Sequence, residues 1–491
     1  MKPRYWWLYI LLLCTPLLFS CATYNMSMQS YYDEVNARDY DKALKTLESK
    51  KILKRNRNRL LYNLEAGRLH HLRKDYVKSN EYFNRADHMV ENIRKSAGSI
   101  AVANILNPMH ETYKGEDFEQ FMMHYYKALN YSGMGLTEDA VVEARRISLA
   151  SGRQNDKFNG KDNRYSKDAF ALTLQGLLYE SAGDINNAFI SFRNAANIYL
   201  EAKGTYYGVA LPAQLQQDLL RTALLMGFDG EFTHYAQLFN YANYQAPSNE
   251  GGELILFIEE GRAPVKDQKT IYLNAEGNGA SFLYVNDEGA DACYDFDYRY
   301  HGFSAADLTG TGTLKIALPA YKLQSLFTAD KYLLVNGIEY RPQLLQDINS
   351  VATNILRERY VQEMAKAIAR QLSKQLMQKG AEAIGEAAAR PANKKNDSNS
   401  STPAQQEEEK KKRRQKAEAA GEAAGFVMSL FNKATEKADT RNWQSLPAFI
   451  SYVRIPLKEG ENNIVLKTGG AEKNISVTGN GRMLIRSEII N

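Results

Sequence analysis

Small residues recur at fixed offsets in the first half of this 491-residue chain, and this pattern constrains the fold more than any other feature. Two segments share offsets of 12, 4 and 3 residues: Gly176, Ala188, Phe192 and Ala195 in one, and Gly67, Ser79, Phe83 and Ala86 in the other. A third set, Ala128, Ala140 and Ala144, repeats the first two offsets. Turn signals separate the first two members of each set, which places them on successive helices. The spacing therefore predicts helix pairs in which a small residue lets the partner helix approach closely.

The predicted helix pairs extend over residues 21–246 and resemble tetratricopeptide repeats. Weaker copies surround Tyr31 and Tyr235. The steps between the small residues of the second helices are 36, 61 and 48 residues, taken at Ala43, Ser79, Ala140 and Ala188. Residues 96–109 supply part of the extra length and are interpreted as an added helix or lid. We therefore expect an irregular solenoid whose curvature does not follow from the repeat family.

The pattern changes after residue 246 to short segments rich in β-branched and aromatic residues. These segments are separated by Gly, Asn and Asp, and they lie at residues 253–258, 270–273, 281–285, 314–318 and 332–335. Asn336-Gly337 is a strong hairpin signal. Similar segments near the end of the chain lie at residues 449–455, 463–466, 474–477 and 482–486. We predict a small β-domain whose first part is residues 247–341 and whose second part is residues 441–491.

The region between the two β parts is expected to be mostly helical. Tyr360, Met364, Ile368 and Leu372 recur every four residues, which predicts an amphipathic helix over residues 342–390. Residues 391–416 lack apolar periodicity and are predicted to form a disordered low-complexity loop. A second helix is expected over residues 417–440. The predicted fold class is thus α+β, with a helical solenoid followed by a β-domain from which a helical hairpin projects.

The first twenty residues have the layout of an export signal. Lys2 and Arg4 precede an apolar run that is too short for a comfortable membrane span. The segment Leu18-Phe19-Ser20-Cys21 resembles a bacterial lipobox, and the resemblance implies that residues 1–20 are a lipoprotein signal peptide and that Cys21 is diacylated. Ala22-Thr23 lacks the acidic residue that retains many enterobacterial lipoproteins in the inner membrane. We therefore expect a lipid-anchored protein of the cell envelope, held at the outer membrane and facing the periplasm.

The net charge of +5 does not indicate a nucleic-acid partner. Removal of Lys2 and Arg4 with the signal leaves +3, and residues 391–416 hold eight Lys/Arg against four Asp/Glu, which is +4. The rest of the chain is therefore near −1 (+3 minus +4), whereas nucleic-acid binding requires basic residues gathered on a folded face. We expect no nucleic-acid partner.

The sequence contains no recognisable catalytic motif, so we predict that the protein is not an enzyme and needs no cofactor or metal. Seven histidines show no ligand-like pair on one helical face: His70, His71, His88, His110, His124, His234 and His301. Cys293 is the only cysteine left after the signal and Cys21, and it is interpreted as a buried structural thiol. Glu116-Asp117 is interpreted as a helix N-terminus. The rival interpretation is an acid pair for glycoside chemistry, which requires a partner carboxylate across a cleft.

An aromatic stripe provides the alternative function. Four aromatic residues alternate along the chain at Tyr294, Phe296, Tyr298 and Tyr300, which would place them on one face of a strand. An exposed stripe of this kind can stack on sugar rings. The alternative hypothesis is therefore an envelope protein that binds or cleaves a glycan through its β-domain.

Taken together, the chain resembles an uncharacterised family of bacterial envelope lipoproteins that contain tetratricopeptide-like repeats. The resemblance is carried by residues 58–67, 113–118, 125–131, 140–146, 316–319 and 437–447. It implies a protein that helps to assemble or export envelope components. Our leading hypothesis is a scaffold that binds an envelope protein or peptide in the concave groove of the repeats while Cys21 fixes its location. A structural subunit of an export or outer-membrane assembly is a third possibility.

Overall fold

The structure, a computed structural model, combines helices and sheets and so confirms the α+β class. It describes residues 24–95, 108–157, 168–241, 243–245, 250–276, 281–285, 291–308, 313–327, 330–389, 411–412, 415 and 436–490. The predicted signal peptide, Cys21, most of the predicted lid, and most of the low-complexity loop and second hairpin helix lie outside these residues. Residues 436–440, predicted as the end of that helix, are non-helical.

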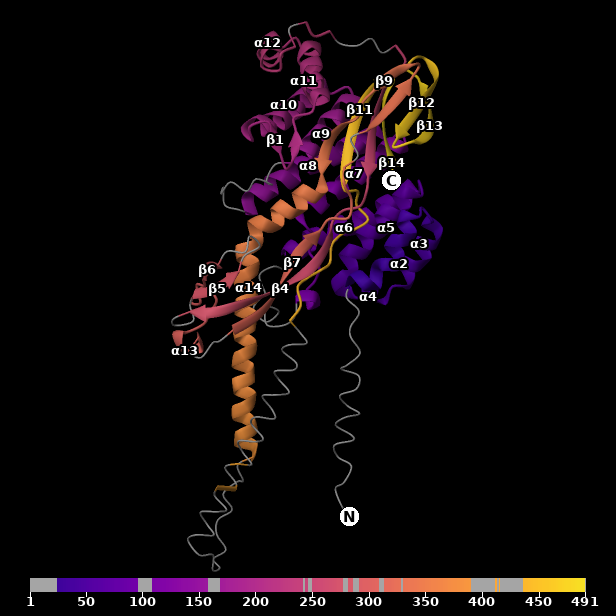
Figure 1. Cartoon of the computed structure of the whole chain (residues 1–491). Helices are drawn as coiled ribbons and strands as arrows, with labels where there is room; N and C mark the ends of the chain where they lie inside the picture. Colours follow the sequence, from indigo (N-terminus) through magenta and orange to yellow (C-terminus); the bar gives the residue numbers. More distant parts are fainter. Residues whose placement is uncertain are drawn as a thin grey trace, which may run out of the picture.

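The first half of the described chain consists of consecutive helix pairs (Figure 1). The pairs are α2 (Tyr24–Asn36) with α3 (Tyr40–Ser49), α5 (Arg59–Leu72) with α6 (Tyr76–Lys95), α7 (Asp117–Gly133) with α8 (Thr137–Lys157), α9 (Ala169–Ser181) with α10 (Ile185–Glu201), and α11 (Ala213–Leu225) with α12 (Asp229–Leu238). Short elements connect them: α4 (Lys51–Lys54), η2 (Asn56–Asn58), η4 (Pro108–His110), β1 (Thr205–Tyr206) and β2 (Val209–Ala210). Side-chain caps begin several of these helices, as where Asp184 accepts a hydrogen bond from the Asn187 amide at 3.2 Å.

The close approach predicted from the small residues is confirmed. A Cβ added to Gly67 would lie 2.6 Å from a ring carbon of Phe83, and one added to Gly176 would lie 2.5 Å from a ring carbon of Phe192. The hydroxyl of Ser79 also donates to the Gly67 carbonyl at 2.7 Å. Each glycine therefore makes room for an aromatic ring of the second helix of its pair.

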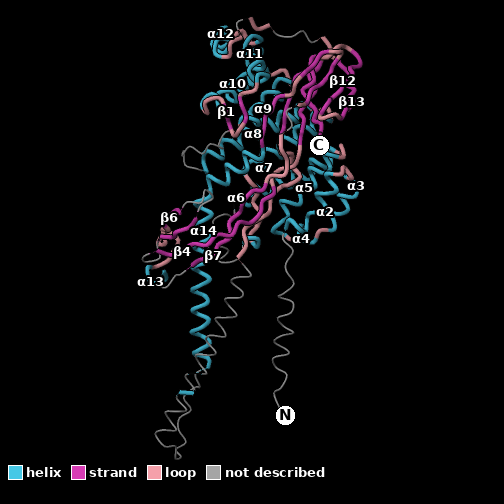
Figure 2. The backbone as a smooth tube through the Cα atoms, viewed as in Figure 1, coloured by secondary structure: helices cyan, strands magenta, loops and turns pink. Residues whose placement is uncertain are grey.

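Apart from the short β1-β2 pair, the described strands form three four-stranded sheets. Figure 2 shows the strands in magenta. The first has the order β10-β11-β3-β14, from β3 (Gly252–Glu260), β10 (Gln343–Asp347), β11 (Phe449–Pro456) and β14 (Arg482–Ile490). The second has the order β13-β12-β8-β9, from β8 (Lys331–Val335), β9 (Ile338–Tyr340), β12 (Gly460–Thr468) and β13 (Ala471–Gly479). These two sheets share an apolar core that includes Leu256, Val335 and Ile464.

The third sheet packs against the longest helix. Its order is β6-β5-β4-β7, from β4 (Val265–Glu276), β5 (Ser281–Val285), β6 (Asp291–Asp295) and β7 (Thr313–Lys322), with the short α13 (Ala305–Leu308) nearby. Figure 1 shows α14 (Ile348–Ala389) running past this sheet and beyond it. Met364, Ile368 and Leu372, part of the predicted four-residue repeat, are buried in the core that they form with this sheet.

Every strand segment predicted from the sequence lies within a strand of the structure. Asn336-Gly337 forms the predicted hairpin turn, with Val335 opposite Ile338 and positive φ angles of 51° and 81° at the two turn residues. The helix predicted over residues 342–390 begins later, at Ile348. Residues 343–347 instead form β10, because β11 supplies a strand with which they pair.

We predict that Gly176→Ala destabilises the protein, because the added methyl group clashes with the buried ring of Phe192. The expected loss is about 1–3 kcal/mol in the free energy of unfolding, measured by urea denaturation. Gly380→Ala is the matched control, since a Cβ added to this glycine of α14 meets nothing within 4 Å. That substitution should stabilise the helix by up to about 1 kcal/mol. Equal effects of the two substitutions would contradict the close-packing interpretation.

Candidate functional site

In the helical region where the sequence predicted a partner-binding groove, the chain's own first sheet packs against helices α7 and α9. The ring of Phe257 on β3 lies 5.4 Å from that of Tyr125 on α7 and 6.4 Å from that of Phe170 on α9. The ring of Trp443 lies 5.8 Å from Phe83. Strand β3 is buried along its whole length, so it needs apolar cover on both faces, and the helices supply one of them.

A buried polar network accompanies this packing. Arg68 of α5 donates to the Glu259 carboxylate of β3 at 2.6 Å, and its guanidinium lies 4.4 Å from the centre of the Tyr126 ring. The hydroxyls of Tyr125 and Tyr126 donate to the same carboxylate at 3.1 and 3.2 Å. The charge of Glu259 is thus compensated on the helical side.

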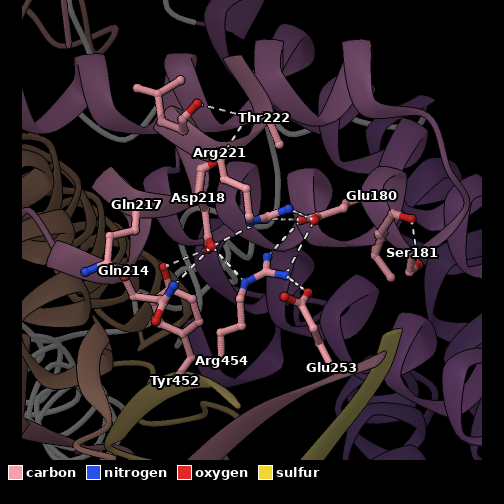
Figure 3. Close-up of polar contacts among 12 residues, drawn as sticks. Glu180, Ser181, Gln214, Gln217, Asp218, Arg221, Thr222, Glu253, Tyr452 and Arg454 are labelled. Atoms are coloured by element: carbon pink, nitrogen blue, oxygen red, sulfur yellow. Dashed lines mark hydrogen bonds and ion pairs between the residues drawn. The ribbon is translucent and has the colours of Figure 1, made fainter. Parts of the chain in front are cut away.

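A larger charge cluster joins the other end of the sheet to α9 and α11 (Figure 3). Arg454 of β11 contacts the carboxylates of Glu180, Asp218 and Glu253, at 2.8 Å for each of the first two. Arg221 pairs with Glu180 as well, and lies 3.6 Å from Asp218. Two cations therefore meet three carboxylates, all of them on side chains that are at most 8% exposed.

The electrostatics of this cluster indicate a structural role, in which it links the first sheet to α9 and α11. Burial alone would lower the pKa of Arg454, but Asp218, Glu180 and Glu253 raise it above its usual value. Burial would likewise raise the pKa of Glu180, and the charges of Arg454 and Arg221 lower it. The pKa of Asp218 is raised, chiefly by burial. These groups are buried and partnered, so they hold the sheet against the helices and are not presented to a substrate.

The helix N-terminus predicted at Glu116 is confirmed, since α7 begins at Asp117. Glu116 pairs with Lys266 at 2.6 Å and with Arg359 of α14, and the three line a cleft of about 240 Å³. Burial alone would raise the pKa of Glu116, but the charges of Lys266 and Arg359 lower it to about 2. This carboxylate therefore links α7, β4 and α14.

Glu119, one helical turn after Glu116, has a raised pKa. Burial, together with the negative charge of Glu116, raises the pKa of Glu119 to about 7. Its side chain accepts hydrogen bonds from the Tyr113 hydroxyl at 2.6 Å and from the Trp443 amide at 2.8 Å. It is 1% exposed, so this carboxyl group is not accessible to a substrate in this structure.

The aromatic stripe predicted over residues 294–300 is wrong. Strand β6 ends at Asp295, and the chain then turns, with the Tyr298 amide donating to the Phe296 carbonyl at 2.9 Å. Phe296 is buried, Tyr294 and Tyr298 are partly buried against the same core, and Tyr300 is 82% exposed, so the four rings form no exposed stripe on one strand. The expectation for Cys293 is also wrong: it is exposed on β6, an edge strand of the third sheet.

His71 and His124 each have a structural partner within the protein. His71 Nδ1 lies 2.6 Å from Asn130 Oδ1, and His124 Nδ1 lies 2.7 Å from Glu143 Oε2. Burial, with a further contribution from Arg68, lowers the pKa of His71 to about 3. Within the described residues, no group of three or more His, Cys, Asp or Glu side chains is arranged to hold a metal ion.

An open groove that the sequence did not predict lies where the first two helix pairs and the end of α7 meet strands β13 and β14. We call it the rim groove, and it is our candidate functional site. Its volume is about 640 Å³, and its walls are the first two helix-pair turns, the end of α7, and strands β13 and β14. The basic side chains that line it are Arg38, Lys74, Lys473 and Arg486, against one acid, Glu488, which pairs with Lys473.

Two copies of one turn contribute to this groove. Arg38-Asp39-Tyr40 and Lys74-Asp75-Tyr76 occupy corresponding positions in successive helix pairs, and the basic and aromatic members of both line the groove. Arg38 and Lys74 each have a φ of 60°, which is uncommon for residues other than glycine. In the sequence, each basic-Asp-Tyr segment by itself indicates only a turn between two helices. Its repetition in successive helix pairs is the signal that could have identified the site.

Comparisons with known proteins identify no family: no family model, no curated protein and no solved structure matches this chain. None of the helices in the described part of the chain combines the length and apolar character that a membrane span requires.

We predict that Arg454→Met strongly destabilises the fold, because it leaves three buried carboxylates with Arg221 as their remaining cation in the cluster. The expected cost is about 3–5 kcal/mol in the free energy of unfolding, measured by urea denaturation. Arg193→Met removes a partly exposed pair with Glu231 and is the matched control, with an expected cost below about 1 kcal/mol. A comparable small cost for both substitutions would show that the buried cluster does not hold the sheet.

Glu119 makes a specific contribution to the pH dependence of stability. Its pKa in the folded protein, about 7, lies above its ordinary value of 4.5, so between these values the folded state binds more protons than the unfolded chain. This contribution makes the free energy of unfolding fall as the pH rises from about 4.5 to about 7. We predict that Glu119→Gln flattens this fall, in urea denaturation at a series of pH values.

Glu138→Gln, at an exposed position on α8, is the control for this experiment and should keep the wild-type slope. Glu65, whose pKa burial also raises to about 7, remains in all three proteins, so the difference between their slopes isolates Glu119. An unchanged slope in Glu119→Gln would contradict the assignment.

Proposed function

We propose that this protein is an envelope lipoprotein, anchored through Cys21, that acts as a protein-interaction scaffold in the assembly or export of envelope components. The observation that carries the scaffold role is the open cationic groove at the rim of the helices. The charged residues of the buried clusters are engaged in internal pairs. Arg38, Lys74 and Arg486 are exposed to solvent and line this groove. Such a surface supports binding without requiring a reactive residue.

We also propose that the helix pairs form an irregular tetratricopeptide-like array. The contacts of Gly67 with Phe83 and of Gly176 with Phe192 support this, because close packing of small and aromatic residues is the basis of such pairs. In this array the inner face holds the chain's own sheet. The partner is therefore expected at the rim groove and not in the concave face.

Glycan binding is not favoured as a second function. Its motivation was an exposed aromatic stripe on one strand, and Phe296, a central member, is buried in the core of the third sheet.

We predict that metabolic labelling with a palmitate analogue in a Gram-negative host labels the wild-type chain and that Cys21→Ala abolishes the label. The reason is that acyl transfer requires the Cys21 thiol of the lipobox-like segment. Cys14→Ala and Cys293→Ala are matched controls, because they remove the other two cysteines, and both should keep the label. Labelling of Cys21→Ala at the wild-type level would remove the anchor from the proposal.

The scaffold role is tested by affinity purification of the tagged full chain from native membranes, with Cys21→Ala as the control for location. Enrichment of specific envelope proteins above that control supports the scaffold, and a stable stoichiometric complex would indicate a structural subunit. Failure to enrich any protein above the control would overturn the proposal.

A further inference from the structure

Strand β14 presents an unpaired edge to the rim groove. It lies at the end of the first sheet with β3 on one side, and no other described strand pairs with it on the other. Residues 485–489 of this strand line the groove. At the usual rise of about 3.3 Å per residue, they offer about 17 Å of strand edge.

Two contacts establish which backbone groups face the groove. The Arg482 carbonyl points towards β3, since a Cβ added to the paired glycine would lie 2.1 Å from its oxygen. The Ile489 carbonyl instead accepts a hydrogen bond from Arg38 Nη2 at 3.3 Å, across the groove. Successive residues of a strand direct their N–H and C=O groups to opposite edges. The backbone groups of Ile485, Ser487 and Ile489 therefore face the groove.

The charges around this edge are complementary to an acidic chain. Lys74 and Arg38 come from the helix turns on one side of β14. Arg486 and Lys473 lie towards the second sheet, the side on which Glu488 pairs with Lys473. A strand added to β14 would point alternate side chains to these two sides, so carboxylates on either of its faces would meet a cation.

Contacts within the protein hold the walls of the groove in place before any partner binds. The ring of Tyr76 rests on α7, where a Cβ added to Gly133 would lie 2.7 Å from it. Ser487 Oγ lies 3.5 Å from His71 Nε2, and the other ring nitrogen of His71 is bound to Asn130. A preformed groove reduces the ordering cost of binding.

We propose that this groove binds an extended acidic segment of a partner protein, which adds as a further strand along the free edge of β14. Backbone hydrogen bonds to Ile485, Ser487 and Ile489 give affinity, and the surrounding cations select acidic side chains. The incoming strand replaces Arg38 at the Ile489 carbonyl, and the released guanidinium binds a carboxylate of the segment. This inference rests on the proposed scaffold function and specifies the chemistry of its partner.

The test uses the full chain in detergent and a fluorescent synthetic peptide of alternating glutamate and valine, with binding followed by fluorescence anisotropy. We expect saturable binding that weakens about 10-fold or more in the double variant Lys74→Glu/Arg486→Glu, because repulsion replaces attraction at the groove. Lys45→Glu/Lys51→Glu makes the same charge change at exposed sites on α3 and α4 and is expected to bind as the wild type does. Equal loss in both double variants, or no binding, would overturn the proposal.

Strand addition is separated from simple charge attraction by two further measurements. An alternately N-methylated peptide keeps the charges but loses backbone donors, and it should bind about 10-fold more weakly or worse. Ser487→Pro removes a donor on the groove side without removing a bond to β3, and it should weaken binding when compared with Ser487→Ala. Full binding of the methylated peptide overturns strand addition, even if the proline variant fails to fold.

The same double variants separate this inference from the scaffold proposal. If membrane purification enriches partners equally from wild type and from Lys74→Glu/Arg486→Glu, the β14 site is overturned and the scaffold stands. If purification enriches nothing while the peptide binds as expected, the groove chemistry stands and the scaffold function falls.

Discussion

The architecture depends on strand β3, which is buried along its whole length. Ile255 and Phe257 pack with the helices, whereas Leu254, Leu256 and Ile258 pack with the second sheet. Both of its neighbours, β11 and β14, come from the last part of the chain, and β14 runs parallel to it. Strand β3 therefore contacts the helices of the first half of the chain and pairs with strands of its last part. Its burial holds these two regions together.

The buried charges determine which side chains of the first sheet face the helices. Arg454 and Glu253 point from adjacent strands to the helical side, where Glu180 and Asp218 meet them. A slip of one residue would turn Arg454 towards the apolar core between the two sheets. Burying the cluster carries a desolvation cost, so we infer that its role is to specify one alignment of sheet and helices rather than to add net stability.

This packing also determines where function can lie. Helical repeats commonly bind partners on their concave face, but here β3 and Trp443 of the same chain pack against the helices through Tyr125 and Phe83. The surface that we propose for a partner is the rim groove, where Arg38 and Lys74 repeat one turn motif beside the edge of β14 that no other described strand covers. In this proposal the partner meets a strand edge and a cationic groove instead of a solenoid interior.

Local patterns in the sequence determined the helix pairs, the strand segments and the Asn336-Gly337 hairpin, because small-residue spacing, β-branched runs and turn residues act over a few neighbours. The aromatic alternation at residues 294–300 led to the wrong prediction of a stripe on one strand, because the chain turns after Asp295. Only the tertiary structure decided that β3 packs against the helices, that Glu259 meets Arg68, and that the longer described strands divide into three four-stranded sheets. Strand pairing joins segments distant in sequence, and a buried ion pair shows no periodicity, so neither carries a local signal.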